Sequence, residues 1–402
     1  MGISKSFEKA IEVLKENSTE NGFLASSLEK HNYKRVWSRD GVVQGLAALM
    51  SEDKFLINVF RKNLLTLKKF QDKTGRIASN IDVKNKKISY GTLVGKIDAT
   101  LWYIIGVGQY FKYTQDKDFL EEFVESIDCC INYLFSLELN GKGLLFIPTG
   151  GDWADEYITH GYILFDQLLY LQALREYKHI LKKTKRKNKS IDKKINLLEK
   201  IIEINYFPSK EKTNNSFVYH KRLYKKIVKE YKKNYPLVYF SSSGFADILD
   251  SFSCCLFLHL FPENQSKKQK IIKHLNLRLS KQKIKILPAF WPPINSKNIF
   301  WEALKNNSLF EFRNKPYCYH NGGLWPLIQG FFISALMNKG RKKEAKKYLE
   351  NFSDFLEKDK YLFYEYINSR NYKSEGIKKI GFSAAGYIIA YLSFIENKPL
   401  FK

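Results

Sequence analysis

Apolar residues recur every three to four positions along most of the chain, which is the spacing of one helix face. Phe7, Ala10, Ile11 and Leu14 follow this spacing near the N-terminus, and the apolar residues of 55–67 follow it again. Each pattern predicts an amphipathic helix that buries one face. The same reasoning predicts further helices over 41–50, 98–113, 119–136, 161–182, 195–204, 244–261, 267–277, 322–338, 341–357 and 382–396.

Short connections separate these predicted helices. Gly340 ends one of them and the next begins at once, as in a helical hairpin. Asp118 is placed to cap the helix that follows it, with Glu121 in the position of a capping box. About a dozen helices joined as hairpins predict an all-α fold, the (α/α)6 toroid, with functional loops at one end of the ring.

Strand signals are few. Residues 86–90 and 144–147 have the composition of short strands or extended loops near the mouth of the ring. The basic stretch 182–194 and the polar stretch 205–235 are expected to be surface excursions. No Gly/Ser-rich linker and no sharp change of composition divides the chain, so we expect residues 1–402 to form a single domain.

Composition supports a folded protein of the cytoplasm. Hydrophobic residues make up 44% of the 402 residues, enough for a sizeable core. No apolar run approaches the roughly 20 residues that cross a bilayer, and the N-terminal segment lacks the apolar centre of a secretory signal. The cysteines include two adjacent pairs, Cys129 with Cys130 and Cys254 with Cys255, which fit no zinc or disulfide framework. Reduced core thiols and a cytoplasmic location are the expectation.

The chain is strongly basic. Lysine and arginine total 67 against 41 acidic residues, a net charge of +26. Such a charge permits binding to nucleic acid or to an anionic surface. The lysines are spread over nearly every polar face, however, and the densest run, at 182–189, has the composition of a solvated loop. We therefore expect no specific nucleic-acid partner and no membrane association, and the sequence leaves room for a homo-oligomer.

Several cofactor motifs are missing from the sequence. It contains no phosphate-binding loop, no dinucleotide fingerprint and no serine-hydrolase elbow. The seven histidines show no close metal-ligand spacing. We expect neither a cofactor nor a metal.

Carboxylates stand beside flat aromatic rings in three segments spread over the whole chain, at 37–40, 151–157 and 364–366, and the aromatic segment 319–326 lies between the last two. Aromatic rings cover the apolar faces of a sugar, and carboxylates bind its hydroxyls and move protons. If these segments meet in one cavity, the residues predict a glycosidase acting on a small sugar.

The segment around Asp155 offers the first catalytic candidate. It places Asp152, Trp153 and Asp155 within a few residues after a glycine pair. Apolar and aromatic neighbours would raise the pKa of Asp155 and keep it protonated as a general acid, with Asp152 and Trp153 binding substrate. The alternative is that Asp152 or Asp155 caps the helix that follows.

The second candidate is Glu365, a carboxylate within an aromatic run. As an ionised base it would activate a water; the alternative is an exposed residue on a strand. His320 and Asn321 could donate to sugar hydroxyls, and Trp325 could stack on the ring. For these three, the alternative is a helix-entry turn with a core tryptophan.

An N-terminal group completes the predicted site. Trp37, Arg39 and Asp40 could grip a sugar, or Arg39 and Asp40 could form a structural ion pair. Asp98 is another candidate for hydroxyl binding, or else a helix cap.

These segments resemble the alkaline/neutral invertases, glycoside hydrolase family 100, and bacterial relatives named amylo-α-1,6-glucosidases. The order of the motifs agrees over residues 35–390, and the string Tyr-His-Asn-Gly-Gly-Leu-Trp-Pro at 319–326 is the most specific. The resemblance implies an (α/α)6 barrel, no cofactor, and hydrolysis with inversion at a glucosyl carbon. Matched residue by residue, Asp155 falls at the general acid and Glu365 at the general base.

The resemblance makes sucrose the expected substrate, split into glucose and fructose. Residues flanking Asp155 and Glu365 differ from those of plant-type members, so an α-1,6-glucosidase or a compatible-solute glucosidase stays an alternative. Rivals of other classes are a sugar epimerase on the same toroid, which would rely on paired histidines, and a non-catalytic protein that binds carbohydrate or polyanions.

Overall fold

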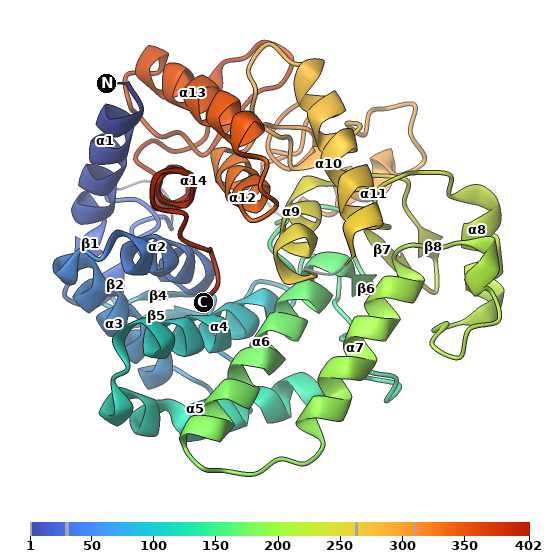
Figure 1. Ribbon diagram of the computed structural model, residues 1–402, viewed down its shortest axis with the longest axis horizontal. Coiled ribbons are helices and arrows are strands. Elements are labelled where there is room, and N and C mark those ends of the chain that lie inside the picture. The colour runs from blue at the N-terminus through green and yellow to red at the C-terminus, as the bar shows by residue number, and fades with distance from the viewer. Residues whose placement is uncertain (1, 29–31, 262–263, 309–310) are drawn as a thin grey trace.

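A ring of helices forms the centre of the molecule in the computed structural model, which describes residues 2–28, 32–261, 264–308 and 311–402. Successive inner helices contact one another, and the last contacts the first, so the ring closes (Figure 1). The inner helices are α2 (Ser38–Ser51), α4 (Ile97–Thr114), α6 (Leu164–Lys183), α9 (Ser251–Leu260), α12 (Pro326–Met337) and α14 (Gly381–Glu396).

A second layer of helices surrounds this ring. Along the chain the outer helices alternate with the inner ones, and each packs against an inner neighbour. The outer helices are α1 (Gly2–Glu16), α3 (Lys54–Lys69), α5 (Lys117–Ser136), α7 (Ile191–Asn205), α10 (Gln265–Ser280) and α13 (Lys342–Lys358). Two further helices, α8 (Lys221–Glu230) and α11 (Trp301–Asn306), lie in connections. The fold is the predicted (α/α)6 toroid.

The two layers differ in sequence for a physical reason. An inner helix meets protein on all sides, and α4, α12 and α14 are accordingly apolar around most of their circumference. An outer helix meets water on one side, and α3 and α13 carry lysines opposite a buried apolar face. Helices α12 and α14 pack especially closely, because a Cβ added at Gly330 would lie 2.0 Å from the carbonyl oxygen of Gly386.

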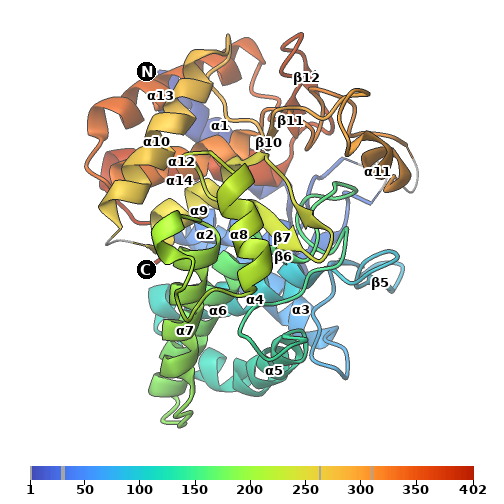
Figure 2. The same ribbon diagram turned by 90° about the vertical axis from the view of Figure 1, so that its right-hand side faces the viewer.

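Short antiparallel strands gather at one end of the ring, which lies toward the right in Figure 2. They form the sheets β1–β2, β3–β4–β5, β6–β7–β8, β9–β10 and β11–β12. The strands are β1 (Ser18–Thr19), β2 (Gly22–Phe23), β3 (Val36–Trp37), β4 (Asn80–Asp82), β5 (Lys87–Ser89), β6 (Tyr162–Ile163), β7 (Tyr239–Ser241), β8 (Gly244–Phe245), β9 (Leu249–Asp250), β10 (Phe290–Trp291), β11 (Tyr366–Ile367) and β12 (Ser374–Glu375).

The local predictions are confirmed in part. Of the two segments expected to be short strands or extended loops, 86–90 contains β5, and 144–147 is a loop with one bridge, from Ile147 to Gly161. The helix expected over 244–261 begins only at Ser251, because β8 and β9 occupy its first residues. The stretch 205–235, expected to be a polar surface excursion, contains the short and mostly exposed helix α8.

The capping prediction for α5 was wrong by two residues. Asp116, not Asp118, is the cap, and its carboxylate accepts a hydrogen bond of 3.0 Å from the backbone N–H of Phe119. Asp118 lies in the first turn, where a negative charge still favours the helix. Of the adjacent cysteine pairs, Cys129 alone is exposed. No helix among the described residues is long and apolar enough to span a bilayer.

Candidate active site

The predicted carbohydrate segments meet at the strand-bearing end of the ring, around a cavity of about 90 Å³. The wall combines loops that lead into α2, α6, α12 and α14 with a loop after α11. The lining residues are Ala25, Asn32, Tyr33, Trp37, Arg39, Asp40, Trp153, Asp155, Arg313, Tyr319, His320, Trp325, Glu365, Ile380 and Phe382. The two predicted catalytic carboxylates, Asp155 and Glu365, therefore face one shared space.

Three of the predicted sugar-binding residues do not line this cavity. Asp98 is buried and forms an ion pair of 2.7 Å with Arg39, which does line the cavity. The side-chain amide of Asn321 is hydrogen-bonded to backbone: its NH₂ donates to the carbonyl of Ile294, and its Oδ1 accepts from the Ile294 N–H. Both residues hold the wall in place from behind.

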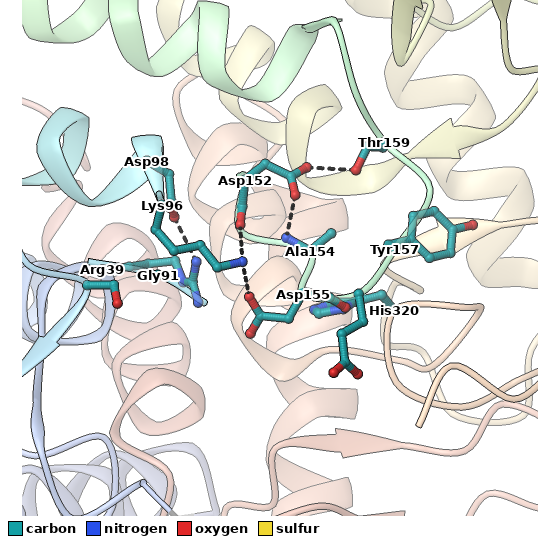
Figure 3. Close-up of polar contacts among 12 residues, drawn as sticks. Arg39, Gly91, Lys96, Asp98, Asp152, Ala154, Asp155, Tyr157, Thr159 and His320 are labelled. Carbon is teal, nitrogen blue, oxygen red and sulfur yellow. Dashed lines mark hydrogen bonds and ion pairs between the residues drawn. The ribbon is translucent and has the colours of Figure 1, made fainter. Parts of the chain in front are cut away.

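Asp152, the third, shapes the loop that presents Asp155. Its carboxylate accepts hydrogen bonds from the Ala154 N–H, at 3.1 Å, and from the Thr159 hydroxyl, at 2.9 Å (Figure 3). Burial raises the pKa of Asp152 to about 7. Neither Asp152 nor Asp155 caps α6, which begins at Leu164 after β6, so the capping alternative is wrong.

Asp155 lies among positive charges. Lys96 contacts its carboxylate and also donates a hydrogen bond of 3.0 Å to the carbonyl of Asp152 (Figure 3). Burial alone would raise the pKa of Asp155, but the charges of Lys96 and Arg39 outweigh it and hold that pKa well below its usual range. The sequence-based expectation of a raised pKa is therefore wrong, because apolar neighbours were visible in the sequence and the distant cations were not.

Glu365 lies in a less charged environment. The Tyr33 hydroxyl donates to its carboxylate, at 2.9 and 3.0 Å from the two oxygens. Burial raises the pKa of Glu365 to about 7, although Arg313 and Tyr33 both favour its ionised form. Gly376 makes room for this side chain, since a Cβ added there would lie 2.5 Å from Oε2 of Glu365. Glu365 is buried just before β11, so the exposed-strand alternative is wrong.

The remaining acid in the wall is Asp40, in the first turn of α2. Burial raises its pKa to about 6, although the neighbouring Arg39 favours the ionised form. The ion pair of Arg39 is with Asp98 and not with Asp40, so the alternative of an Arg39–Asp40 pair is wrong. Strand β3 places this turn, because Trp37 pairs with Asn80 immediately before α2 begins.

Aromatic rings pack together in the wall of the cavity. Trp325 stacks on His320 with ring centroids 5.0 Å apart, and Trp153 meets both rings edge-on. The Trp325 indole donates to the carbonyl of Tyr319 at 3.0 Å. Such packed indoles present both a core contact and an apolar surface to a ligand. The two interpretations of Trp325, core residue and sugar platform, are compatible here.

His320 is held in one tautomer. Its Nδ1 lies 3.2 Å from the carbonyl oxygen of Asp155, so Nδ1 carries the proton and donates it. Burial lowers the pKa of His320 to about 3, which keeps the ring neutral. Among the described residues, no cluster of three or more His, Cys, Asp or Glu side chains could hold a metal ion.

Some site residues were missed by the sequence-based prediction. Asn32, Tyr33 and Arg313 line the cavity, and Lys96 contacts Asp155 from outside the lining set. None belongs to an aromatic–carboxylate segment, so composition offered no signal for them. Tyr319 stood inside a noted motif and could have been included; the guanidinium of Arg313 lies 4.4 Å from the centre of its ring.

Helical toroids with their functional loops at one end are a known glycosidase architecture, and the comparisons agree with this class. A sequence profile described as "Alkaline and neutral invertase" matches residues 5–236 and 254–397. The chain therefore belongs to the alkaline and neutral invertase family, glycoside hydrolase family 100. This confirms the resemblance seen in the motifs.

Individual relatives are distant. The chain is 22% identical over 405 residues to probable alkaline/neutral invertase A, chloroplastic, of Arabidopsis thaliana, with 86% of this chain and 61% of that protein aligned. It is 23% identical over 386 residues to neutral/alkaline invertase 1, mitochondrial, of Oryza sativa subsp. japonica, with 84% and 61% aligned. The chain thus spans about three fifths of the length of these curated relatives.

A solved structure supports the fold. The GH63 mannosylglycerate hydrolase of Thermus thermophilus, in complex with Tris, aligns with a TM-score of 0.66 at 13% identity. The alignment covers 95% of this chain and 99% of that one. At this identity the match establishes a common toroid and leaves the substrate to be argued from the site.

Proposed function

We propose that the protein is an inverting glycoside hydrolase that cleaves an α-glucosidic bond of a small sugar, with sucrose as the foremost candidate. The observation that carries the proposal is that Asp155 and Glu365 line the same cavity, among aromatic rings and polar groups suited to a sugar. Family membership gives the reaction class. We take residues 1–402 to act as one catalytic domain.

In the proposed reaction, Asp155 gives its proton to the glycosidic oxygen as the bond to the anomeric carbon breaks. Glu365 takes a proton from a water that attacks the opposite face of the sugar ring. Acid–base assistance of this kind contributes roughly 10²–10⁴-fold to the rate. Because positive neighbours favour the ionised form of Asp155, it must acquire its proton from solvent before or as the substrate binds.

Other residues of the wall have binding roles in this proposal. Arg39 and Asp40 are positioned to hold sugar hydroxyls, and Trp37 and Trp325 offer apolar ring faces. Neutral His320 can accept a hydrogen bond from a sugar hydroxyl at Nε2, because its Nδ1–H already donates to the carbonyl of Asp155. Asp98, Asp152 and Asn321 are assigned to supporting that wall instead of touching the sugar.

Sucrose is proposed because the named plant relatives are invertases. An α-1,6-glucosidase or a hydrolase of glycosylated compatible solutes is the alternative, and the Thermus thermophilus structure is that of a mannosylglycerate hydrolase. A cytoplasmic location stays a prediction, since the two plant relatives are named chloroplastic and mitochondrial. No observation bears on an oligomer or on binding to nucleic acid.

A sugar epimerase on the same toroid fits the site less well. Proton transfer at a sugar carbon by paired histidines needs two imidazoles facing one substrate. His320 is the one histidine among the described residues that line the cavity, and burial keeps it neutral. Non-catalytic carbohydrate or polyanion binding does not account for two largely buried carboxylates in the wall of one pocket.

A substrate panel tests the proposed function. The purified protein should release glucose from sucrose or from another α-glucoside in a panel of isomaltose, trehalose and glucosylglycerate. Asp155→Asn is the matched control, because it keeps the shape of the side chain and removes its acidity. Release of free sugar by the wild type and not by Asp155→Asn is the expected result. Epimerised monosaccharide, or binding without cleavage of any glycoside, would overturn the proposal.

A further inference from the structure

A lysine outside the cavity wall contacts the carboxylate proposed to donate the proton. Lys96 is absent from the residues that line the cavity, yet its ammonium contacts Asp155, which lines it. The same ammonium donates to the carbonyl of Asp152. Both side chains of the ion pair are largely buried, with 13% of Lys96 and 25% of Asp155 exposed. Figure 3 shows Lys96 reaching across from the start of α4 to the loop that carries both aspartates.

The backbone holds this lysine in place at two points. The Lys96 N–H donates to the carbonyl of Tyr90 at 2.8 Å, and the next N–H, of Ile97, donates to the carbonyl of Gly151 at 2.8 Å. Lys96 is the residue immediately before α4 and occupies the N-cap position of that helix. The segment 90–96 is tightly folded, since a Cβ added at Gly91 would lie 2.0 Å from the carbonyl of Val94. The chain thus ties the lysine and the aspartate loop together twice, through backbone and through side chain.

We propose that Lys96 is a positioning residue for Asp155, which fixes the carboxylate against the loop and sets the acidic limb of the pH–rate profile. The proposal rests on the proposed function, because it assumes that Asp155 takes part in the reaction. Lys96 itself touches neither the sugar nor the attacking water. It acts by determining where the Asp155 carboxylate lies and at which pH that carboxylate loses its charge.

The positive charge of Lys96 determines the direction in which its removal shifts the pKa of Asp155. A cation in contact favours the ionised carboxylate, so removing it raises the pH at which Asp155 takes up a proton. Among the opposite charges that lower the pKa of Asp155, Lys96 acts most strongly, ahead of Arg39. The titratable and charged groups that face Asp155 from the surrounding elements are Lys96, Arg39, Asp40, Arg313, Tyr319, His320 and Glu365.

The acidic limb of the pH–rate profile reports the pKa of Asp155, whether this residue acts as the acid or as the base. In a pair of essential acid and base, the lower pKa governs the acidic limb and the higher one governs the alkaline limb. Asp155 has the lower pKa and Glu365 the higher one, at about 7. A change at Lys96 is therefore read on the acidic side of the profile, where Glu365 contributes no inflection.

The test is the pH dependence of kcat/KM for Lys96→Met, measured with sucrose or with the glycoside that the panel shows to be cleaved fastest. The acidic limb should move upward by about one to two pH units, as expected for the loss of one charge-assisted contact. Lys96→Arg, which retains the charge, should keep the limb near its wild-type position. Exposed Lys142 provides the matched control, Lys142→Met, because its ammonium donates to the carbonyl of Tyr219 and not to a carboxylate of the site.

Circular dichroism and thermal unfolding establish that each variant is folded, and Lys96→Gln replaces Lys96→Met if the latter is not. A limb that stays at the wild-type pH in a folded Lys96→Met or Lys96→Gln variant overturns the proposal, as does a uniform loss of activity at every pH. Failure of the proposed function has a different signature, since it appears as full activity in Asp155→Asn with Lys96 unchanged.

Discussion

The two walls of the cavity carry the same functional group in opposite electrostatic settings. Asp155 is held by the Lys96 ammonium, with Arg39 nearby, whereas the closest polar contact of Glu365 is the neutral phenol of Tyr33. Glu365 is buried and Asp155 is partly buried, and burial prevails only at Glu365, whose pKa rises to about 7. Burial by itself therefore does not decide which carboxylate holds a proton; the count of nearby cations does.

This asymmetry has a structural origin. The Asp155 wall is assembled from the first turn of α2, which supplies Arg39, and the loop before β6. Lys96, the residue before α4, contacts this wall from outside the cavity lining. The Glu365 wall is built from the loop before β11 and from Tyr33, and the missing side chain of Gly376 leaves space for Glu365. Substitutions confined to one wall test the comparison one side at a time, although the charge of Asp155 also contributes to the raised pKa of Glu365.

The largest expected effect comes from neutralising either carboxylate. Asp155→Asn and Glu365→Gln should each lower kcat by roughly 10²–10⁴-fold, because each removes one proton-transfer group and keeps the shape of the side chain. Steady-state hydrolysis of the best substrate measures the loss. Glu375→Gln is the control, since Glu375 bonds Tyr366 and does not line the cavity. Activity near the wild-type level in one variant would remove that residue from its role.

Stability of the Asp155 wall depends on a buried ion pair. Asp98→Asn leaves the Arg39 guanidinium without its partner, and breaking a buried pair in this way costs about 3–5 kcal/mol of unfolding free energy. Urea denaturation followed by circular dichroism measures the change. Asp82→Asn is the control, because the Arg35–Asp82 pair is longer, at 4.0 Å, and more exposed. Equal losses for the two variants would contradict the structural role given to Asp98.

Gly376 tests the opposite wall. Gly376→Ala should lower kcat by about 10²-fold, because the new Cβ must push the Glu365 side chain aside and a shift of about 1 Å has this effect on catalysis. The backbone there has φ of +81°, which adds strain for any other residue. Gly340→Ala is matched to it, with φ of +69° and no atom within 4 Å of the added Cβ. If both alanine variants lose activity equally, backbone strain and not displacement of Glu365 is responsible.

The smallest expected effect is a shift of the alkaline limb. Tyr33→Phe removes a hydrogen bond that favours the ionised form of Glu365, so its pKa, already raised to about 7, should rise further. The alkaline limb of the kcat/KM profile should then move upward by about one pH unit. The acidic limb, governed by Asp155, should stay in place. A shift of the acidic limb in Tyr33→Phe would mean that the two walls are not independent.

Periodicity predicted the fold well, because outer helices of the toroid have one apolar face and inner helices are apolar on most faces. Apolar positions at helical spacing revealed α1 and α3, and the fully apolar runs of α12 and α14 matched inner helices. The prediction failed at residues 244–250, where two short strands precede α9. Strand β8 forms a tight hairpin with the adjacent β7, a local signal that the helix prediction overlooked. Strand β9 pairs with the distant β10, which no local pattern announces.

Site residues that stand within a recognisable sequence motif were predicted, and residues that reach the site from distant segments were missed. Asp155 and Glu365 stand in aromatic–carboxylate segments and Trp325 in an aromatic one, and all three line the cavity. Lys96 and Tyr33 reach the two carboxylates from distant segments, and a lone lysine among 67 basic residues carries no signal. The protonation of Asp155 was misjudged for the same reason, because a pKa depends on charges that only the fold brings together.

The central claim is that Asp155 and Glu365 act from opposite faces of one sugar ring. ¹H NMR during the first minutes of sucrose hydrolysis tests it most directly, because the anomeric protons of α- and β-glucose are resolved before mutarotation mixes them. The account predicts that β-glucose appears first from this α-glucoside. Initial release of α-glucose would show retention of configuration and would contradict it.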